Sequence, residues 1–238
     1  MDDPRIIVAM GGGGFSMEPD NPLLDDHVLG LARVSRGRDR PRVCFLATAS
    51  GDSDAYLAQF YTVFARRAEA THLSLFIRTE PDVERFLLEQ DAIYVGGGNT
   101  ANMLAIWRIH GVDRALRRAW EAGIVLTGLS AGSICWFESG TTDSFGALAA
   151  LAGGLGFLPG SHSPHYDGEA ERRPIYHDLI ARGLLPDGYA ADDGAALVFR
   201  GTELAEVVAS RPVARAYRVT RGPADEAIET ELPTRYLG

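Results

Sequence analysis

The sequence predicts an α/β fold in which helices cover both faces of a mostly parallel sheet, giving three layers. Three observations predict it. Apolar runs alternate with amphipathic segments as far as residue 140, which is the rhythm of repeated strand–helix–strand units. Glycine clusters follow several of these runs, at the carboxyl ends of the expected strands. Beyond residue 160, short apolar runs joined by turns predict antiparallel strands near the C-terminus, added at one edge of the sheet.

Apolar runs before residue 130 predict the parallel strands. They cover residues 6–10, 42–47, 72–77, 92–95 and 124–126. Later runs predict the antiparallel additions. These cover residues 195–199, 205–208, 214–219 and 227–232. Since we find no linker, repeat or low-complexity tract, residues 1–238 are expected to form one domain.

Helices are predicted between the early strands. Residues 57–64 carry apolar side chains at helical spacing. Thr79-Glu80-Pro81-Asp82 is typical of a helix start with proline in the first turn. A helix around Met103 is expected to end at His110-Gly111, and residues 113–121 predict another helix before the strand at 124–126.

Composition restricts the partners and the compartment. A net charge of -9 and a pI near 5.1 argue against a nucleic acid or an anionic membrane surface. The two cysteines, Cys44 and Cys135, lie in apolar runs without metal-ligand spacing, which predicts buried free thiols. The first five residues lack an apolar signal core, and no stretch approaches the ~18 apolar residues of a membrane span. We therefore expect a cytoplasmic protein.

The most informative motif is Gly128-Leu129-Ser130-Ala131-Gly132, directly after the run at 124–126. A serine between a strand and a helix, here expected to begin at residues 133–137, is held on a sharp turn with its hydroxyl exposed. The helix N-terminus would offer N–H groups to a developing oxyanion. An ordinary glycine-rich turn is the alternative interpretation.

Two glycine clusters have different interpretations, one structural and one functional. Gly11 to Gly14 does not have the glycine spacing of a dinucleotide fingerprint, and no glycine run continues into a Gly-Lys-Ser/Thr phosphate loop. Close backbone packing at a strand end explains this cluster. The second cluster precedes a helix, so the amide of Gly97 or Gly98 could form an oxyanion hole together with the amide of Ala131.

A serine nucleophile needs a base and an acid that orients the base. His162 and His165 lie in an expected loop, where Pro164 restricts the backbone. His177 is expected on an exposed helix face. The candidate acids are Asp143, Asp192 and Asp193, whereas Glu138 is expected on the helix after Ser130 and exposed to solvent. Residue types alone leave these choices open.

The combination resembles the peptidase E family of aspartyl dipeptidases, which is related to cyanophycinase. Four motifs in this order carry the resemblance: Val95-Gly96-Gly97-Gly98-Asn99-Thr100, Gly128-Leu129-Ser130-Ala131-Gly132-Ser133, Thr141-Thr142-Asp143 and Pro164-His165-Tyr166. The resemblance extends from the first strand to about residue 200. It implies a flavodoxin-like fold, similar to class I glutamine amidotransferases, and a serine exopeptidase that cleaves after N-terminal aspartate. Such an enzyme is expected to need no metal or organic cofactor.

Site roles also follow from the resemblance. It implies Ser130 as nucleophile and His165 as base. Asp143 matches an aspartate implicated in activity, and Asp193 matches the third member of the triad, although many relatives have glutamate there. Arg172 falls where the family holds the substrate aspartate, with Arg173 as a substitute. A guanidinium suits this role because it can bind a carboxylate through two hydrogen bonds.

Three other classes of protein share part of this pattern. An α/β-hydrolase esterase shares the serine motif but normally has a late histidine, and no histidine follows His177. A glutamine amidotransferase needs cysteine where this chain has Ser130. A flavodoxin-like module that only binds a small ligand would make the motifs coincidental. The expected partners are small peptides with an acidic N-terminal residue, and a homodimer is possible.

Overall fold

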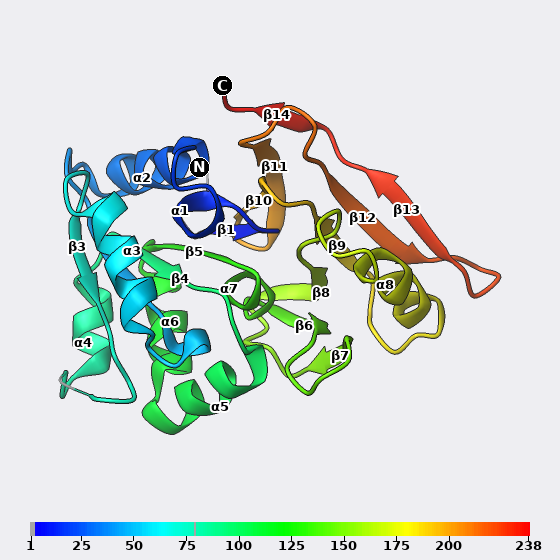
Figure 1. The fold of residues 1–238 in the computed structure, drawn as a ribbon, viewed down its shortest axis with the longest axis horizontal. Coiled ribbons are helices and arrows are strands. Elements are labelled where there is room, and N and C mark those ends of the chain that lie inside the picture. Colours follow the sequence, from blue (N-terminus) through cyan, green and yellow to red (C-terminus); the bar gives the residue numbers. More distant parts are fainter. Residues whose placement is uncertain (1–2, 79) are drawn as a thin grey trace.

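The computed structural model describes residues 3–78 and 80–238. Its central feature is an eight-stranded sheet with the order β14-β11-β10-β1-β5-β4-β2-β3 (Figure 1). The five strands from β1 to β3 in this order run parallel to one another. They comprise β1 (Ile6–Met10), β5 (Val125–Leu129), β4 (Ala92–Val95), β2 (Arg42–Leu46) and β3 (Glu69–His72).

Three later strands extend this sheet beyond β1. β10 pairs antiparallel with both β1 and β11, and β14 pairs parallel with β11. Their bounds are β10 (Ala195–Arg200), β11 (Glu203–Ala209) and β14 (Thr234–Tyr236). The predicted α/β fold, with a mostly parallel sheet and antiparallel strands near the C-terminus, is confirmed.

Helices cover both faces of the sheet, as predicted. One face packs against α1 (Gly14–Met17), α2 (Leu23–Arg36) and α3 (Asp54–Phe64) through a core that includes Phe15, Phe45 and Phe60. The other face packs against a core that includes Trp107, Leu116 and Ile134. This second layer contains α4 (Val83–Leu88), α5 (Thr100–His110), α6 (Val112–Glu121) and α7 (Ala131–Ile134).

A second, six-stranded sheet lies beside the first, with the order β13-β12-β9-β8-β6-β7 (Figure 1). Tyr176 and Ile180 of α8 (Arg172–Ala181) pack against Ala190 and Val219 of this sheet. Its strands are β6 (Phe137–Thr142), β7 (Ala149–Ala152), β8 (Leu158–Ser163), β9 (Gly188–Ala191), β12 (Ala216–Arg221) and β13 (Ala227–Glu231). The predicted strands at 214–219 and 227–232 belong to this sheet, and not to an edge of the first.

Two local predictions were wrong. The third parallel strand ends at His72, because the Asp52 carboxylate accepts the N–H groups of Leu75 and Phe76 and holds the run at 72–77 in turns. The helix after Ser130 ends at Ile134, so Glu138 lies in β6, where its carboxylate accepts the Gly160 N–H at 2.9 Å.

The predicted helix start at 79–82 corresponds to α4, whose N-cap Asp82 accepts the Arg85 N–H at 3.0 Å, while Thr79 lies outside the described residues. Both cysteines are free and buried, as expected. In the described part of the chain, no helix has the length and apolar character needed to cross a membrane.

Candidate active site

Ser130 occupies the turn between β5 and α7 in a backbone conformation with φ 55° and ψ -119°. Such a conformation is strained for a residue other than glycine, and it turns the side chain out of the sheet. The flanking glycines permit the turn, because a Cβ on either Gly128 or Gly132 would collide with the carbonyl oxygen of Val95 in β4. The packing of α7 against β4 therefore fixes the geometry at Ser130.

The loop between β4 and α5 passes beside this serine. A Cβ placed on Gly97 would lie 3.3 Å from the Cβ of Ser130. The Gly97 N–H is already used, since it donates to the Tyr56 hydroxyl at 3.3 Å. The N–H groups of Gly98 and Ala131 have no acceptor among the described residues. Of the three predicted oxyanion donors, these two are free.

His165 follows β8 and reaches the same end of the sheet. Its N–H donates to the Gly11 carbonyl at 3.2 Å. Gly11 directly follows β1, and Met10 is paired with Leu129 of the neighbouring strand that leads into Ser130. The backbone register thus brings His165 to the strand ends where Ser130 lies. Among the described residues, His165 and the Ser130 hydroxyl share no hydrogen bond, and catalytic hydrogen bonds often form only with substrate present.

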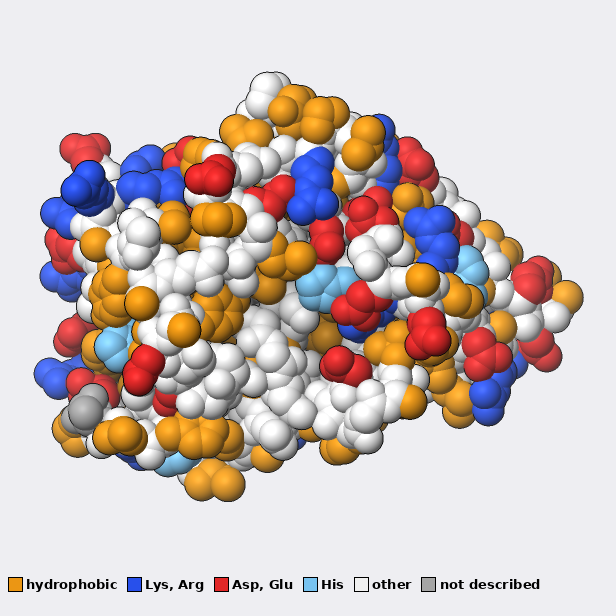
Figure 2. Space-filling view, viewed as in Figure 1, with side chains coloured by type: hydrophobic (Ala, Val, Ile, Leu, Met, Phe, Trp, Pro, Cys, Tyr) orange, Lys and Arg blue, Asp and Glu red, His pale blue; other side chains and the backbone are white. Residues whose placement is uncertain are grey.

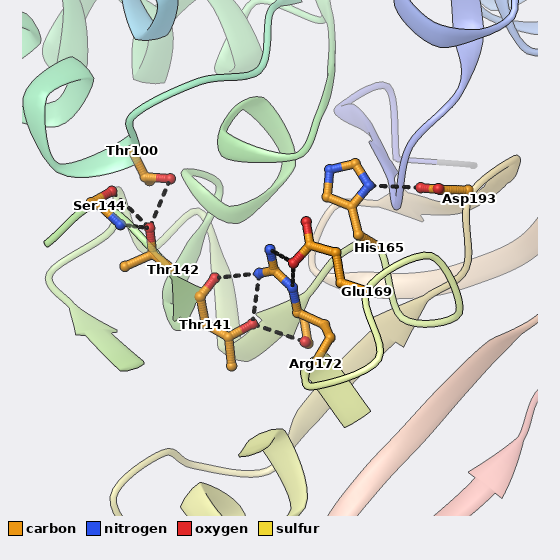
Figure 3. Close-up of polar contacts among 9 residues, drawn as sticks. Thr100, Thr141, Thr142, Ser144, His165, Glu169, Arg172 and Asp193 are labelled. Atoms are coloured by element: carbon orange, nitrogen blue, oxygen red, sulfur yellow. Dashed lines mark hydrogen bonds and ion pairs between the residues drawn. The ribbon is translucent and has the colours of Figure 1, made fainter. Parts of the chain in front are cut away.

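Asp193 orients the His165 ring. Its Oδ1 lies 2.7 Å from Nδ1 of His165, as Figure 3 shows. A carboxylate at Nδ1 accepts a hydrogen bond from the N–H there, which leaves Nε2 free to take a proton from elsewhere. Burial raises the pKa of Asp193, but the hydrogen bond and charge of His165 and two nearby arginines outweigh it, so this pKa lies below its ordinary value. Asp193 is therefore ionised at neutral pH.

The short side chain of Asp193 reaches His165 because two glycines let it lie close. A Cβ on Gly12 would collide with Oδ1 of Asp193, and a Cβ on Gly168 would clash with its Oδ2. The Asp193 N–H also donates to the Asp167 carboxylate at 2.8 Å. Because Gly12 and Gly168 have no side chains, the backbone packs close to the Asp193 carboxylate. An aspartate, which is shorter than a glutamate, can therefore reach His165.

The other candidate acids lie elsewhere. Asp143 follows β6 with an exposed side chain and lines the pocket beside Ser130, without a bond to His165 among the described residues. Asp192 instead accepts the Arg215 N–H at 2.9 Å, and burial raises its pKa to about 6. Of the three candidate acids, Asp193 is the one that contacts His165.

The competing histidines are placed away from the site. His162 is not in a loop but inside β8, stacked on Phe137, and burial lowers its pKa to about 3. His177 lies on α8, half-buried, and its Nε2 is 2.9 Å from a Glu229 carboxylate oxygen. Neither is suited to accept a proton from Ser130.

Arg172 opens onto the same pocket as Ser130. This pocket has a volume of about 320 Å³ and is lined by Gly98, Asn99, Ser130, Asp143, Glu169 and Arg172. The guanidinium donates to the Glu169 carboxylate and to Thr141 of β6 (Figure 3). Sequence reasoning missed Glu169, although its spacing of three residues from Arg172 was a visible signal.

Arg173 points to a different neighbourhood. Its guanidinium lies over the rings of Tyr166 and Tyr217, so it does not replace Arg172 at the pocket.

In the space-filling view, acidic and basic side chains gather around a histidine in the region between the two sheets (Figure 2). The pocket therefore combines a serine with one buried cation and two carboxylates.

Gly12→Ala tests how closely Asp193 must approach His165. The added Cβ would push the carboxylate away from the ring, and a misplacement of about 1 Å can lower turnover by about 10²-fold. We expect that loss in kcat with the fold retained, measured by steady-state kinetics and circular dichroism. Gly30→Ala is the matched control, because a Cβ there meets nothing within 4 Å. Unchanged kcat in Gly12→Ala would contradict the account of Asp193.

The fold and the site define the class of protein as an α/β peptidase with its site at the carboxyl ends of parallel strands. Residues 7–207 match the family model of Peptidase family S51, and the chain belongs to that family. It is 53% identical over 235 residues to the uncharacterized peptidase YgaJ of Bacillus subtilis, covering 98% of this chain and 100% of that one. It is 29% identical over 195 residues to Peptidase E of Shewanella denitrificans, covering 78% and 81% of the two chains.

Solved structures share the fold. A peptidase from an acI-B1 Actinobacterium superimposes with a TM-score of 0.69 at 18% identity, covering 96% of this chain and 94% of the other. A candidate Peptidase E from Listeria monocytogenes EGD-e has a TM-score of 0.58 at 16% identity, with 96% and 99% covered. The resemblance to peptidase E inferred from the motifs is confirmed at the level of the family.

Proposed function

We propose that the protein is a serine exopeptidase that releases N-terminal aspartate from dipeptides or short peptides. The observation that carries this proposal is the His165–Asp193 pair at the strand ends beside the strained Ser130 turn, with the Arg172 cation in the same pocket. The family supports peptidase activity over an esterase or a binding module. The serine mechanism and the preference for aspartate are the parts that need testing.

The mechanism follows from the placement of these groups. Ser130 Oγ attacks the carbonyl carbon of the N-terminal residue while Nε2 of His165 takes the hydroxyl proton. The negative charge on the carbonyl oxygen is stabilised by the free N–H groups of Gly98 and Ala131. His165 then gives its proton to the departing amine, which leaves the aspartyl group as an ester on Ser130. Water attacks this ester with His165 again as base, and aspartate leaves as the serine regains its proton.

Two charged side chains in the pocket support the proposed exopeptidase activity and the proposed specificity for aspartate. The Arg172 guanidinium, buried beside Thr141, binds the side-chain carboxylate of the substrate. Asp143 is exposed at the pocket and has no bond to His165 among the described residues. We assign it to bind the α-ammonium group that only a free N-terminus carries. Blocking that amine is therefore expected to abolish cleavage.

A panel of p-nitroanilides tests the proposal. Asp-p-nitroanilide should be cleaved in preference to the Glu, Ala and Leu compounds, N-acetyl-Asp-p-nitroanilide should be inert, and Ser130→Ala should be inactive throughout. Equal cleavage of the blocked substrate would rule out an exopeptidase. Preference for Leu or Ala would rule out the aspartyl specificity.

Arg172→Ala tests the substrate contact. Hydrogen bonds to charged groups contribute about 1.5–3 kcal/mol, so KM for Asp-p-nitroanilide should rise by roughly 10- to 100-fold while kcat changes little. Arg182→Ala, at the exposed arginine that caps the C-terminus of α8, is the matched control. A KM equal to that of the wild type would remove Arg172 from substrate binding.

A further inference from the structure

In the free enzyme the Arg172 guanidinium already holds a carboxylate, that of Glu169. Nε of Arg172 lies 2.9 Å from Oε2 of Glu169, and Nη2 lies 2.6 Å from the same oxygen. These two donors form the edge that a substrate carboxylate would use in a two-bond contact. Figure 3 shows the Glu169 carboxylate on this edge of the guanidinium. An acidic side chain of a substrate would compete with it for the same position.

The two partners of this ion pair differ in their freedom to move. The Arg172 side chain is 4% exposed, whereas that of Glu169 is 50% exposed. Nη1 of Arg172 donates to the carbonyl and the hydroxyl of Thr141, at 3.2 and 3.3 Å, which ties the guanidinium to β6. Glu169 is therefore the partner that can leave, and Arg172 is the fixed one.

Glu169 can leave without disturbing the catalytic histidine. Its backbone N–H donates to the His165 carbonyl at 3.1 Å, and its carbonyl accepts the Arg172 N–H at 2.9 Å. Because these bonds hold the turn through the main chain, a rotation of the Glu169 side chain is enough to open the guanidinium. The catalytic groups keep their places during the exchange.

We infer that Glu169 is a specificity-determining residue, an internal carboxylate that occupies Arg172 until the side-chain carboxylate of a substrate replaces it. The inference rests on the proposed preference for N-terminal aspartate. A buried guanidinium without a partner is costly. Glu169 therefore stabilises Arg172 between turnovers, when no substrate carboxylate is bound. Affinity for an acidic substrate is then the difference between two carboxylates competing for one cation.

The test measures binding apart from catalysis. Calorimetric titration of L-aspartate into Ser130→Ala protein is compared with titration of L-asparagine, the neutral analogue of similar shape. In that background, Glu169→Gln removes the competing charge, so the Kd for L-aspartate should fall about two- to fivefold, the range for an ion pair with one half-exposed partner. The Kd for L-asparagine should stay the same.

Control variants separate the possible outcomes. Glu171→Gln removes the same charge from an exposed side chain nearby and should leave both Kd values unchanged. Glu169→Asp keeps the charge but shortens its reach, and should tighten L-aspartate binding as Glu169→Gln does. Unchanged or weaker L-aspartate binding in Glu169→Gln would overturn the role of Glu169 alone. Equal binding of aspartate and asparagine by Ser130→Ala protein with Glu169 and Arg172 intact would overturn the aspartyl preference, and this inference with it.

Discussion

Replacing Ser130 by alanine is expected to lower kcat by about 10⁵- to 10⁶-fold, the largest effect of any single substitution in this protein. Loss of the nucleophile in a serine peptidase removes nearly all of the contribution of its triad, because the remaining members have no group to activate. Alanine has the same backbone demands at φ 55° as serine, so the turn and the fold should persist. Steady-state cleavage of Asp-p-nitroanilide measures the effect.

The control for this variant is Ser133→Ala. Ser133 lies on the same short helix, and its hydroxyl donates to the Ser130 carbonyl at 2.8 Å, so it supports the turn without being the nucleophile. We expect a modest loss of stability and activity within tenfold of the wild type. Residual activity of Ser130→Ala within a hundredfold of the wild type would mean that another group attacks the substrate.

Asp193→Asn is expected to give the second largest loss, roughly 10⁴-fold in kcat. The amide keeps the size of the side chain but can donate a hydrogen bond to Nδ1, which favours the tautomer that carries its proton on Nε2. That tautomer cannot accept the proton of Ser130. Since the pKa of Asp193 lies below its ordinary value, the native carboxylate remains ionised across the neutral range, so the loss should be seen throughout it.

Two neighbouring acids serve as comparisons for Asp193. Asp192→Asn removes a carboxyl that accepts the Arg215 N–H, and should leave kcat within a few-fold of the wild type. Asp143→Asn should raise KM more than it lowers kcat, because this carboxylate lines the pocket beside Ser130 and has no bond to His165 among the described residues. If Asp143→Asn lost 10⁴-fold in kcat while Asp193→Asn remained active, the assignment of the orienting acid would have to be reversed.

The central strands of the first sheet could be predicted well because they are buried on both faces. β1 and β4 are continuous apolar runs, β2 is apolar after Arg42 and β5 begins with Val125-Leu126, and the amphipathic helices α3, α5 and α6 lie between them. The apolar spacing of α2 was present in the sequence but was not used. The shift of β3 depended on a contact from Asp52, which no local pattern reveals.

The second sheet could not be predicted from its strands. β6 and β8 are rich in glycine, serine and threonine, with sequences FESGTT and LPGSHS, and neither shows the alternation of a half-buried strand. Their pairing is set by tertiary context, including the cover that α8 gives to the sheet. For this reason the sequence interpretation placed His162 in a loop and Glu138 on a helix.

Ser130 and His165 could be proposed as nucleophile and base because each lies in a local motif that carries the family resemblance. The resemblance implied Asp193 as the partner of His165, together with Asp143. Residue types alone could not select Asp193 for this role, since the contact depends on Gly12 near the N-terminus and on Gly168 in another loop. The same holds for Tyr56, whose hydroxyl accepts the Gly97 N–H and so leaves Gly98 as the free donor. Long-range contacts of single side chains decide these roles.

The most direct test of the central claim is to isolate the covalent intermediate on Ser130. An aspartyl p-nitrophenyl ester should acylate the enzyme faster than water removes the acyl group, so rapid acid quenching followed by peptide mass spectrometry can locate it. We expect the mass of one aspartyl group on the peptide that contains Ser130, and none in Ser130→Ala. Turnover of the ester with an unmodified Ser130 peptide, or an adduct on another residue, would contradict the account.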